Sequence, residues 1–441
     1  MSRDTLESGG RDTHGARVPR GAFAAVTLAY WAFMLTDGAL RMLVLLHFHT
    51  LGFTPLQLAW LFLLYELAGV ATNLGAGWLG ARFGLNATLF AGLLLQVLAL
   101  LALAELDPAW SIALSVAFVA LVQGVAGVAK DLTKTGAKSA VKRLAPSGAP
   151  EGTLFRLVAL LTGSKNAVKG LGFFVGTVLL GAFGFRDALF ALAFVLVLVF
   201  IAVTIAPPPG LGAGKRGVGT RDVLSSSPAV NRLSAARVFL FGARDTWFVV
   251  GVPIWFHDAL SDGTASADAR AFALVGGFMA LWIIAYGIVQ AGAPTLLRAA
   301  RHTLADSLEA ARRWAGRLTL VTAVIAAVTF AAGTTPTPAL TAALVLGLLA
   351  FGAVFAINSS LHSYLILALA GDERLTMDVG LYYSANALGR LLGTLLSGLS
   401  YQAGGLSGCL VAAALMAWTS RLWAGRLARL AEAPASLPAS A

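Results

Sequence analysis

Residues 152–180, GTLFRLVALLTGSKNAVKGLGFFVGTVLL, form a largely apolar segment with two lysines near its middle. The segment is long enough to cross a bilayer, which takes about 20 mostly apolar residues as a helix. Lys165 and Lys169 are four residues apart, so both ammonium groups lean toward one helix face. A cation at the bilayer centre costs about 3 kcal/mol on insertion scales. We expect this face to line a substrate or ion pathway; alternatively, the lysines reach the headgroups or pair with neighbouring acids.

The whole chain has the composition of a helical membrane protein. Hydrophobic residues make up 58% of its 441 residues and charged residues 12%, whereas a soluble domain is about 25% charged. The apolar runs are continuous rather than alternating, which disfavours a barrel. The net charge of +11 comes from basic residues that mostly separate apolar runs. Membrane topology explains them better than nucleic-acid binding does, so the expected surroundings are a lipid bilayer and no nucleic acid.

The apolar runs predict an all-α polytopic membrane protein with twelve spans in two six-helix halves. The spans are expected at residues 21–49, 55–81, 86–104, 109–130, 153–181, 186–206, 232–257, 270–294, 314–333, 338–370, 374–402 and 405–424. A polar stretch rich in Gly, Ser and Pro divides them into six and six. The expected domains are a tail at 1–20, a half at 21–206, a central loop at 207–231, a half at 232–424 and a tail at 425–441.

The connections between spans predict the orientation. Even-numbered connections carry thirteen basic residues: Arg82, Lys134, Lys138, Lys142, Arg143, Lys215, Arg216, Arg221, Arg298, Arg301, Arg312, Arg313 and Arg374. Odd-numbered connections carry Arg186 and Arg270. The positive-inside rule therefore places both termini in the cytoplasm of a cell whose inner (plasma) membrane holds the protein.

An internal repeat relates the fifth and eleventh spans. The sequence SKNA at 164–167 is followed by GTVLLG at 176–181, and SANA at 384–387 is followed by GTLLSG at 393–398. A repeat between two six-helix halves is typical of a duplicated transporter with its site at the interface of the halves. The alternative is chance similarity among the small residues that membrane helices favour.

Further charged residues lie deep inside the predicted spans. The deep cations are Arg41, Lys165, Lys169, Arg244 and Arg390, and the deep anions are Asp37, Glu66 and Asp245. This excess of positive charge favours a small anionic substrate, because forked arginines match phosphate or arsenate oxygens. Asp37 and Arg41 are one turn apart and form an intrahelical pair in the alternative interpretation. Arg244 and Asp245 point about 100° apart, so we expect each to face a different partner.

Two features permit less specific readings. Lys130, Lys134, Lys138 and Lys142 form a ladder at the end of the fourth span. The ladder is expected to anchor the protein to headgroups, or else to attract an anion to the inner mouth. His47 and His49 point apart on a helix, and without a Cys or His cluster near them we expect no metal site. The sequence also suggests no catalytic site and no cofactor.

Six plus six spans with a basic central loop resemble the major facilitator superfamily. The family's loop signature, Gly-x-x-x-Asp-Arg-x-Gly, matches GWLGARFG at residues 77–84 except that Ala81 replaces the Asp. The resemblance implies transport by alternating access, in which two halves rock about a central site.

A closer resemblance covers nearly the whole chain and is to ArsJ, a group of organoarsenical efflux permeases in that superfamily. It is carried by residues 30–49, 130–142, 161–172, 241–253 and 382–398. It implies export of 1-arseno-3-phosphoglycerate, arsenate resistance and a functional link to a glyceraldehyde-3-phosphate dehydrogenase. The residues alone indicate a small multivalent anion.

These observations predict a carrier and not an enzyme. Arg41 and Arg244 are the expected substrate clamp, supported by Lys165, Lys169, Asn386 and Arg390. Asp37, Glu66 and Asp245 would hold these cations in place or exchange protons. A carrier for another organophosphate or organic anion is the alternative. A receptor or scaffold with a permease fold is a third reading, which the unbalanced charge disfavours.

Overall fold

The computed structural model describes residues 20–83, 85–144, 151–205, 227–297, 303–333, 335–370 and 375–432. Residues 1–19, most of the predicted central loop, residues 433–441 and Gly84 of the loop signature lie outside the described residues. Residues 425–432, predicted as part of the C-terminal tail, continue α11 instead. Within the described ranges the chain forms eleven helices and no strand. They are α1 (Arg20–Thr50), α2 (Pro55–Phe83), α3 (Leu85–Ala104), α4 (Ile112–Leu144), α5 (Glu151–Ile205), α6 (Pro228–Phe248), α7 (Gly251–Leu260), α8 (Ala265–Leu296), α9 (Leu304–Ala332), α10 (Pro338–Leu369) and α11 (Leu375–Glu432).

Ten helical segments in the described part of the chain are long and apolar enough to cross a membrane. Two of them contain two spans each. The backbone leaves the helical conformation at Gly184 inside α5 and at Gly404 and Gly405 inside α11. Counting these as pairs gives the twelve expected spans. The predicted seventh span consists of two helices, because α6 ends at Phe248 and α7 begins at Gly251.

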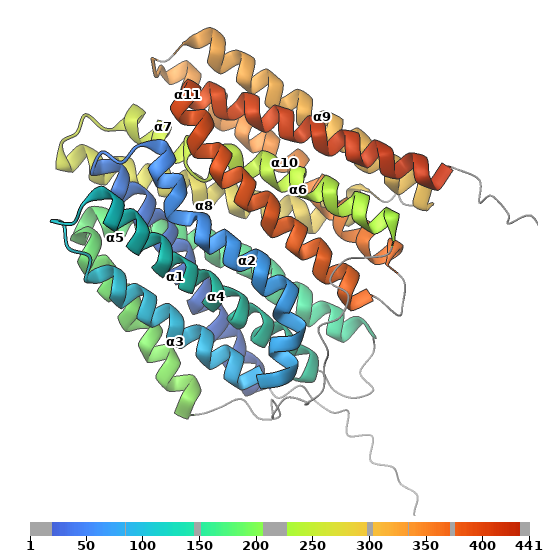
Figure 1. Cartoon of the computed structure of the whole chain (residues 1–441), viewed down its shortest axis with the longest axis horizontal. Helices are drawn as coiled ribbons and strands as arrows, with labels where there is room; N and C mark the ends of the chain where they lie inside the picture. The colour runs from blue at the N-terminus through green and yellow to red at the C-terminus, as the bar shows by residue number, and fades with distance from the viewer. Residues whose placement is uncertain are drawn as a thin grey trace, which may run out of the picture.

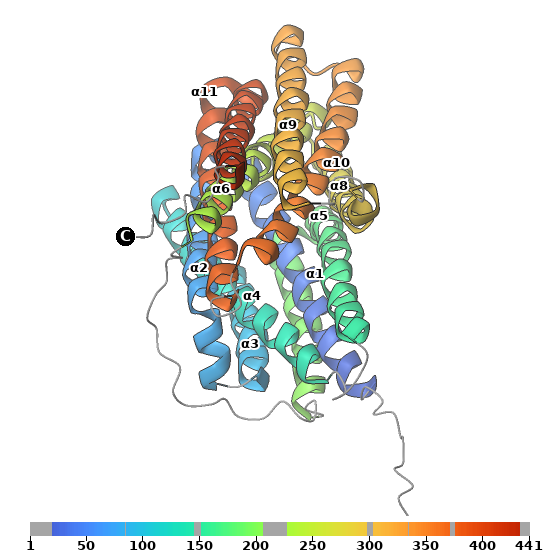
Figure 2. The same ribbon diagram turned by 90° about the vertical axis from the view of Figure 1, so that its right-hand side faces the viewer.

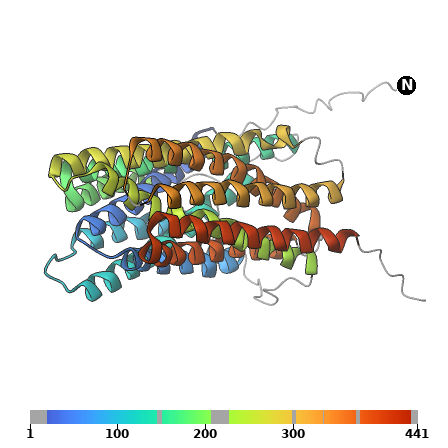
Figure 3. The same ribbon diagram turned by 90° about the horizontal axis from the view of Figure 1, so that it is seen from above.

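The long helices run roughly parallel to one another (Figures 1 and 3). The helices α3 and α9 lie on opposite sides of the bundle (Figure 1). Inside each half, two glycines one turn apart allow the close contact of two helices. Gly172 and Gly176 of α5 lie against the backbone of Leu35 and Ala39 in α1. Small residues therefore decide which helices touch in the first half.

The second half repeats this contact with α11 and α6. Gly389 lies against the backbone of Val238, and Gly393 lies against that of Gly242. Since Arg41 comes two residues after Ala39, and Arg244 two residues after Gly242, the two arginines occupy equivalent positions. The glycine contacts thus express the repeat that the GTVLLG and GTLLSG sequences predict.

Glycines also bring the two halves together. Gly276 of α8 lies against Thr177 of α5, and a methyl group added to Gly398 of α11 would come 2.6 Å from Ala59 Cβ in α2. The helices α2 and α11 accordingly lie side by side (Figures 1 and 2). Near the other end of the same pair, a methyl group on Gly380 would lie 4.0 Å from the Asn73 carbonyl oxygen. The pair is therefore closest at the end where α1 finishes and α2 begins.

Candidate functional site

One buried charge pair joins three helices of the first half. Lys169 Nζ of α5 lies 2.5 Å from Asp37 Oδ2 of α1, and the Tyr65 hydroxyl of α2 donates to Asp37 Oδ1 at 2.5 Å. The lysine reaches α1 because Gly38 leaves room for the α5 backbone at Lys169. Both oxygens of a buried carboxylate are thereby satisfied, as a buried charge requires.

A longer network crosses from one half to the other. Glu66 Oε1 of α2 accepts from Arg41 Nη2 at 2.5 Å and from Arg390 Nη2 of α11 at 2.6 Å. Arg390 Nε lies 3.5 Å from Asp245 Oδ2 of α6. Glu66 and Asp245 are almost fully buried, so the arginines neutralise carboxylates that have lost their water. The Arg390 side chain therefore links a carboxylate of each half.

The structure contradicts one alternative interpretation and one expectation about ion pairing. Asp37 pairs with Lys169 and Arg41 with Glu66, so the intrahelical Asp37–Arg41 pair does not form. Arg244 does pair with its neighbour, since its Nε lies 2.6 Å from Asp245 Oδ1. The long arginine side chain spans the angle between the two positions on α6, which an argument from Cα–Cβ directions alone overlooks.

Arg237 of α6 belongs to this region and is not among the site residues predicted from the sequence. It is only 5% exposed. Its Nε donates to Asn386 Oδ1 at 3.2 Å, and its Nη1 donates to the carbonyl and hydroxyl oxygens of Ser359 at 3.1 Å each. Within the described ranges no carboxylate lies at ion-pair distance from it. The sequence does contain a signal for it, namely an arginine inside the predicted seventh span.

Aromatic rings connect Arg237 to the network. The Phe241 ring centroid lies 4.1 Å from the Arg237 guanidinium carbon and 4.9 Å from that of Arg244. Tyr382 covers Arg237 at 4.8 Å and Phe355 covers Arg244 at 5.5 Å. Cation–π contacts hold a guanidinium without neutralising it. The result is a column of positive charge along one side of α6.

The lysine ladder begins deeper than expected. Lys130 is buried, with its Nζ 4.0 Å from the Tyr65 ring centroid, so it belongs to the charged centre and not to a headgroup anchor. Lys134 contacts Asp131 Oδ1 at 3.3 Å and Asn73 Oδ1 at 3.1 Å. The side chains of Lys138 and Lys142 lie outside the described part of the structure.

Two further predicted site residues, Asn386 and Lys165, lie on α11 and α5. Asn386 is a ligand of Arg237, and Lys165 is half-buried on α5 one turn before Lys169. Asn358 and His362 of α10 are fully buried, and their side chains have no hydrogen-bond partner among the described residues. They lie one residue before and three residues after Ser359 on α10, so two unsatisfied polar side chains are close in sequence to the Arg237 contact.

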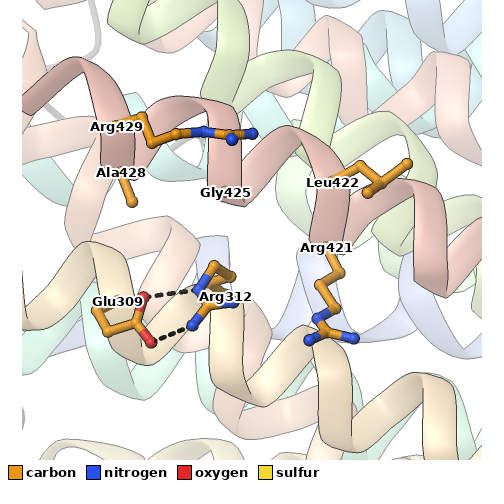
Figure 4. A pocket seen from close by; sticks show the side chains of 7 residues that line it. All are labelled: Glu309, Arg312, Arg421, Leu422, Gly425, Ala428 and Arg429. Atoms are coloured by element: carbon orange, nitrogen blue, oxygen red, sulfur yellow. Dashed lines mark hydrogen bonds and ion pairs between the residues drawn. The ribbon is translucent and has the colours of Figure 1, made fainter.

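A distinct basic cavity of about 490 Å³ lies between α9 and α11 (Figure 4). Glu309 accepts two hydrogen bonds from Arg312 at 2.7 Å there, while Arg421 and Arg429 also line the cavity. Its lining includes none of the deep charged residues described above. We therefore take the charged centre between the halves as the candidate site.

Comparison with known proteins gives a family and a fold. The model of the Major Facilitator Superfamily matches residues 23–394. A comparison with curated proteins found no match. Among solved structures, a POT family transporter in complex with a thioalcohol-conjugated peptide is 14% identical, with 92% of this chain and 95% of that chain covered and a TM-score of 0.67. A bacterial homologue of the iron transporter ferroportin in an inward-facing state is 16% identical, with coverages of 93% and 100% and a TM-score of 0.67.

Proposed function

Since the chain belongs to the major facilitator superfamily, we propose that this multi-pass carrier exports a small multivalent organic anion by alternating access. The site would be the charged centre between the two halves, where transporters built from repeats bind their substrates. The family and its transporter neighbours indicate a carrier and not an enzyme.

The observation that carries the proposal is the unbalanced buried charge. Four buried carboxylates, Asp37, Glu66, Asp131 and Asp245, lie among six buried or nearly buried cations. The cations are Arg41, Lys130, Lys169, Arg237, Arg244 and Arg390. Unmatched charge in a low-dielectric region is costly. An anion with more than one negative charge would remove that cost.

The network suggests how binding is coupled to movement. The anion's oxygens would replace Glu66 and Asp245 on the arginine forks, since guanidinium binds phosphate-like groups as well as carboxylates. Arg390 would then release Glu66, which belongs to the other half. Substrate binding would thereby exchange an interhalf ion pair for contacts that both halves make with the cargo. The freed carboxylates are candidates for proton coupling.

We further propose 1-arseno-3-phosphoglycerate as the cargo, on the strength of the resemblance to ArsJ. This anion carries an arsenyl group at one end and a phosphoryl group at the other. Arg41 and Arg244, at equivalent positions of the two halves, would each hold one end. Arg237, Lys169 and Arg390 would complete the positive field. A glyceraldehyde-3-phosphate dehydrogenase would supply the cargo, and export would confer resistance to arsenate.

Arsenate tolerance of cells carrying the carrier, with and without the dehydrogenase, tests this cargo. We expect the carrier alone to protect weakly, and the pair to restore growth and release arsenate outside. Equal protection by the carrier alone would contradict the organoarsenical. Protection by neither, together with uptake of another organophosphate into everted vesicles, would favour that alternative cargo.

We also propose an inner-membrane location with both termini in the cytoplasm, on the strength of the basic connections. Ser226, outside the described residues, provides the test. The single natural cysteine, Cys409, is buried and gives little background. A cysteine replacing Ser226 should react with an impermeant thiol reagent in everted vesicles. Labelling in intact cells would reverse the orientation.

A further inference from the structure

A second cluster of polar side chains lies where α1 and α7 end. His49 Nε2 is 2.7 Å from Asp258 Oδ1, and His257 Nδ1 is 3.5 Å from the same oxygen. One nitrogen or oxygen atom from each of the three residues lies within 4.8 Å of the others. His49 belongs to the first half of the molecule, and the other two belong to the second. The cluster therefore joins the halves outside the central network.

Among the three residues, His257 has the most incomplete hydrogen bonding. It is only 6% exposed, and neither ring nitrogen makes an aligned hydrogen bond. Nε2 lies 3.1 Å from Asp268 Oδ1, close enough for an electrostatic contact. Phe272 stacks on the ring at 5.3 Å, and His49 meets it edge-on at 5.1 Å. Both ring nitrogens therefore face carboxylates without an aligned hydrogen bond, and a bound ligand would satisfy this buried imidazole better.

We propose that His49, His257 and Asp258 bind a divalent transition metal ion of the Zn²⁺ class. Imidazole nitrogens and a carboxylate oxygen are the ligands such ions prefer, at about 2.0–2.2 Å. Tetrahedral coordination at that radius separates ligand atoms by about 3.4 Å. The distances of 2.7 and 3.5 Å in the cluster bracket that value.

Two neighbouring features suit the same ion. Asp268 lies beside His257 Nε2 and accepts from the Ser261 hydroxyl, which is how carboxylates commonly orient a metal-bound histidine. The side chain of Asp258 is 53% exposed, so ions can enter from solvent and water can occupy the fourth position. In the proposed topology this end of the bundle lies outside the cytoplasm.

The position of the cluster gives the ion an effect on transport. Metal bonds from α1 and α7 would hold the halves together at the end where α2 and α11 are already closest. Alternating access requires that end to open, so the ion would trap the carrier closed there. This effect rests on the proposed transport function, whereas metal binding does not.

Binding is tested on the purified full-length protein without a histidine tag, using Zn²⁺ in calorimetry and Co²⁺ in absorption spectroscopy. We expect one Zn²⁺ per chain and a melting temperature that rises with its concentration. His49→Ala and Asp258→Asn should each weaken Zn²⁺ binding at least about 10-fold. His47→Ala is the matched control, because His47 lies on the same helix but stacks on Phe185 at 4.1 Å. Binding that is absent in the wild type, or unchanged in His49→Ala, would overturn the site.

The effect on transport is tested by adding Zn²⁺ at the outer face of proteoliposomes. Inhibition should occur in the wild type and in His47→Ala, and should be lost in His49→Ala. Zn²⁺ that binds without slowing transport would overturn the trap and leave the site standing. Substrate uptake by His49→Ala in the absence of Zn²⁺ reports separately on the proposed transport function.

Discussion

Arg390 and Arg237 lie at the same α6–α11 interface, Arg390 partly buried and Arg237 buried, and their surroundings differ. Arg390 lies between two carboxylates, with Glu66 at 2.6 Å and Asp245 at 3.5 Å. Arg237 contacts an amide, a hydroxyl, a carbonyl and two aromatic rings. The first arginine is neutralised by protein, while the second keeps its full charge. Paired cations hold the halves together, and an unpaired one remains available to a cargo.

The two arrangements have opposite energetic consequences. Removing one partner of a buried ion pair leaves an uncompensated charge and costs about 3–5 kcal/mol. Removing a cation that has no anionic partner relieves a desolvation cost instead. Stability and transport should therefore change together at Glu66 and separately at Arg237.

The largest effect is expected for Glu66→Gln. The change removes the carboxylate that Arg41 and Arg390 share, so Arg41 loses its carboxylate partner and Arg390 keeps only the longer contact with Asp245. We expect a loss of about 3–5 kcal/mol in stability, seen as low expression and a lower melting temperature in detergent. Glu105→Gln is the control, because the Glu105–Arg186 pair is exposed and should contribute less than about 1 kcal/mol.

The double variant Glu66→Gln with Arg41→Gln sharpens this test. It leaves Arg390 with Asp245 and should recover much of the stability. Transport should stay low, because a cargo ligand is gone. Full transport by a well-expressed double variant would remove Arg41 from the proposed clamp.

The next largest effect concerns Arg237→Gln. A hydrogen bond to a charged group contributes about 1.5–3 kcal/mol, so anion uptake should fall about 10- to 100-fold. The melting temperature should stay the same or rise, because no carboxylate loses a partner. Uptake into proteoliposomes and thermal melting of the same preparation measure both quantities.

Arg232 supplies the control for that variant, since it lies on the same helix and donates to the Arg426 carbonyl oxygen in an exposed position. Arg232→Gln should transport normally. A strongly destabilised Arg237→Gln protein would show that Arg237 serves the packing of α6 against α11, and the comparison with Arg390 would fail.

A smaller effect is expected for Arg244→Lys. Lysine keeps the charge beside Asp245 but loses the planar fork that binds two oxygens of one group. We expect about a 10-fold drop in transport with little change in stability. Lys165→Arg is the comparison variant. Its transport should change by less than about threefold, because residue 165 is expected to contribute positive charge to the site and not a specific binding geometry. Equal losses in the two variants would mean that charge alone matters at Arg244.

The smallest effect is expected for Ser359→Ala. The hydroxyl is one of two Ser359 oxygens that Arg237 Nη1 contacts, and the backbone carbonyl remains. A neutral hydrogen bond contributes about 1 kcal/mol, so uptake should fall about fivefold or less. A loss as large as that of Arg237→Gln would show that the hydroxyl positions the guanidinium.

The charges in the spans were readable from the sequence, because apolar runs with few polar residues make each exception visible. The fold followed from the same runs. Which acid meets which base was not readable, since Glu66 and Arg390 lie on helices of different halves and only helix packing brings them together. Arg237 was not predicted, because it lies only five residues inside the predicted span 232–257, where an arginine side chain can reach the headgroups. The neighbours of His49 were not readable either, because they belong to α7 and only helix packing brings them to the end of α1.

The single residue at which α5 changes direction bears on how the protein is made. Gly184 has φ 77°, a left-handed conformation that glycine adopts readily. With alanine there, one continuous helix of 55 residues would measure about 80 Å, far more than a bilayer of about 30 Å. The fifth and sixth spans are joined by a turn at a single residue, so we expect them to insert into the lipid together as a helical hairpin. On this account Gly184 matters during biosynthesis, before any cargo exists.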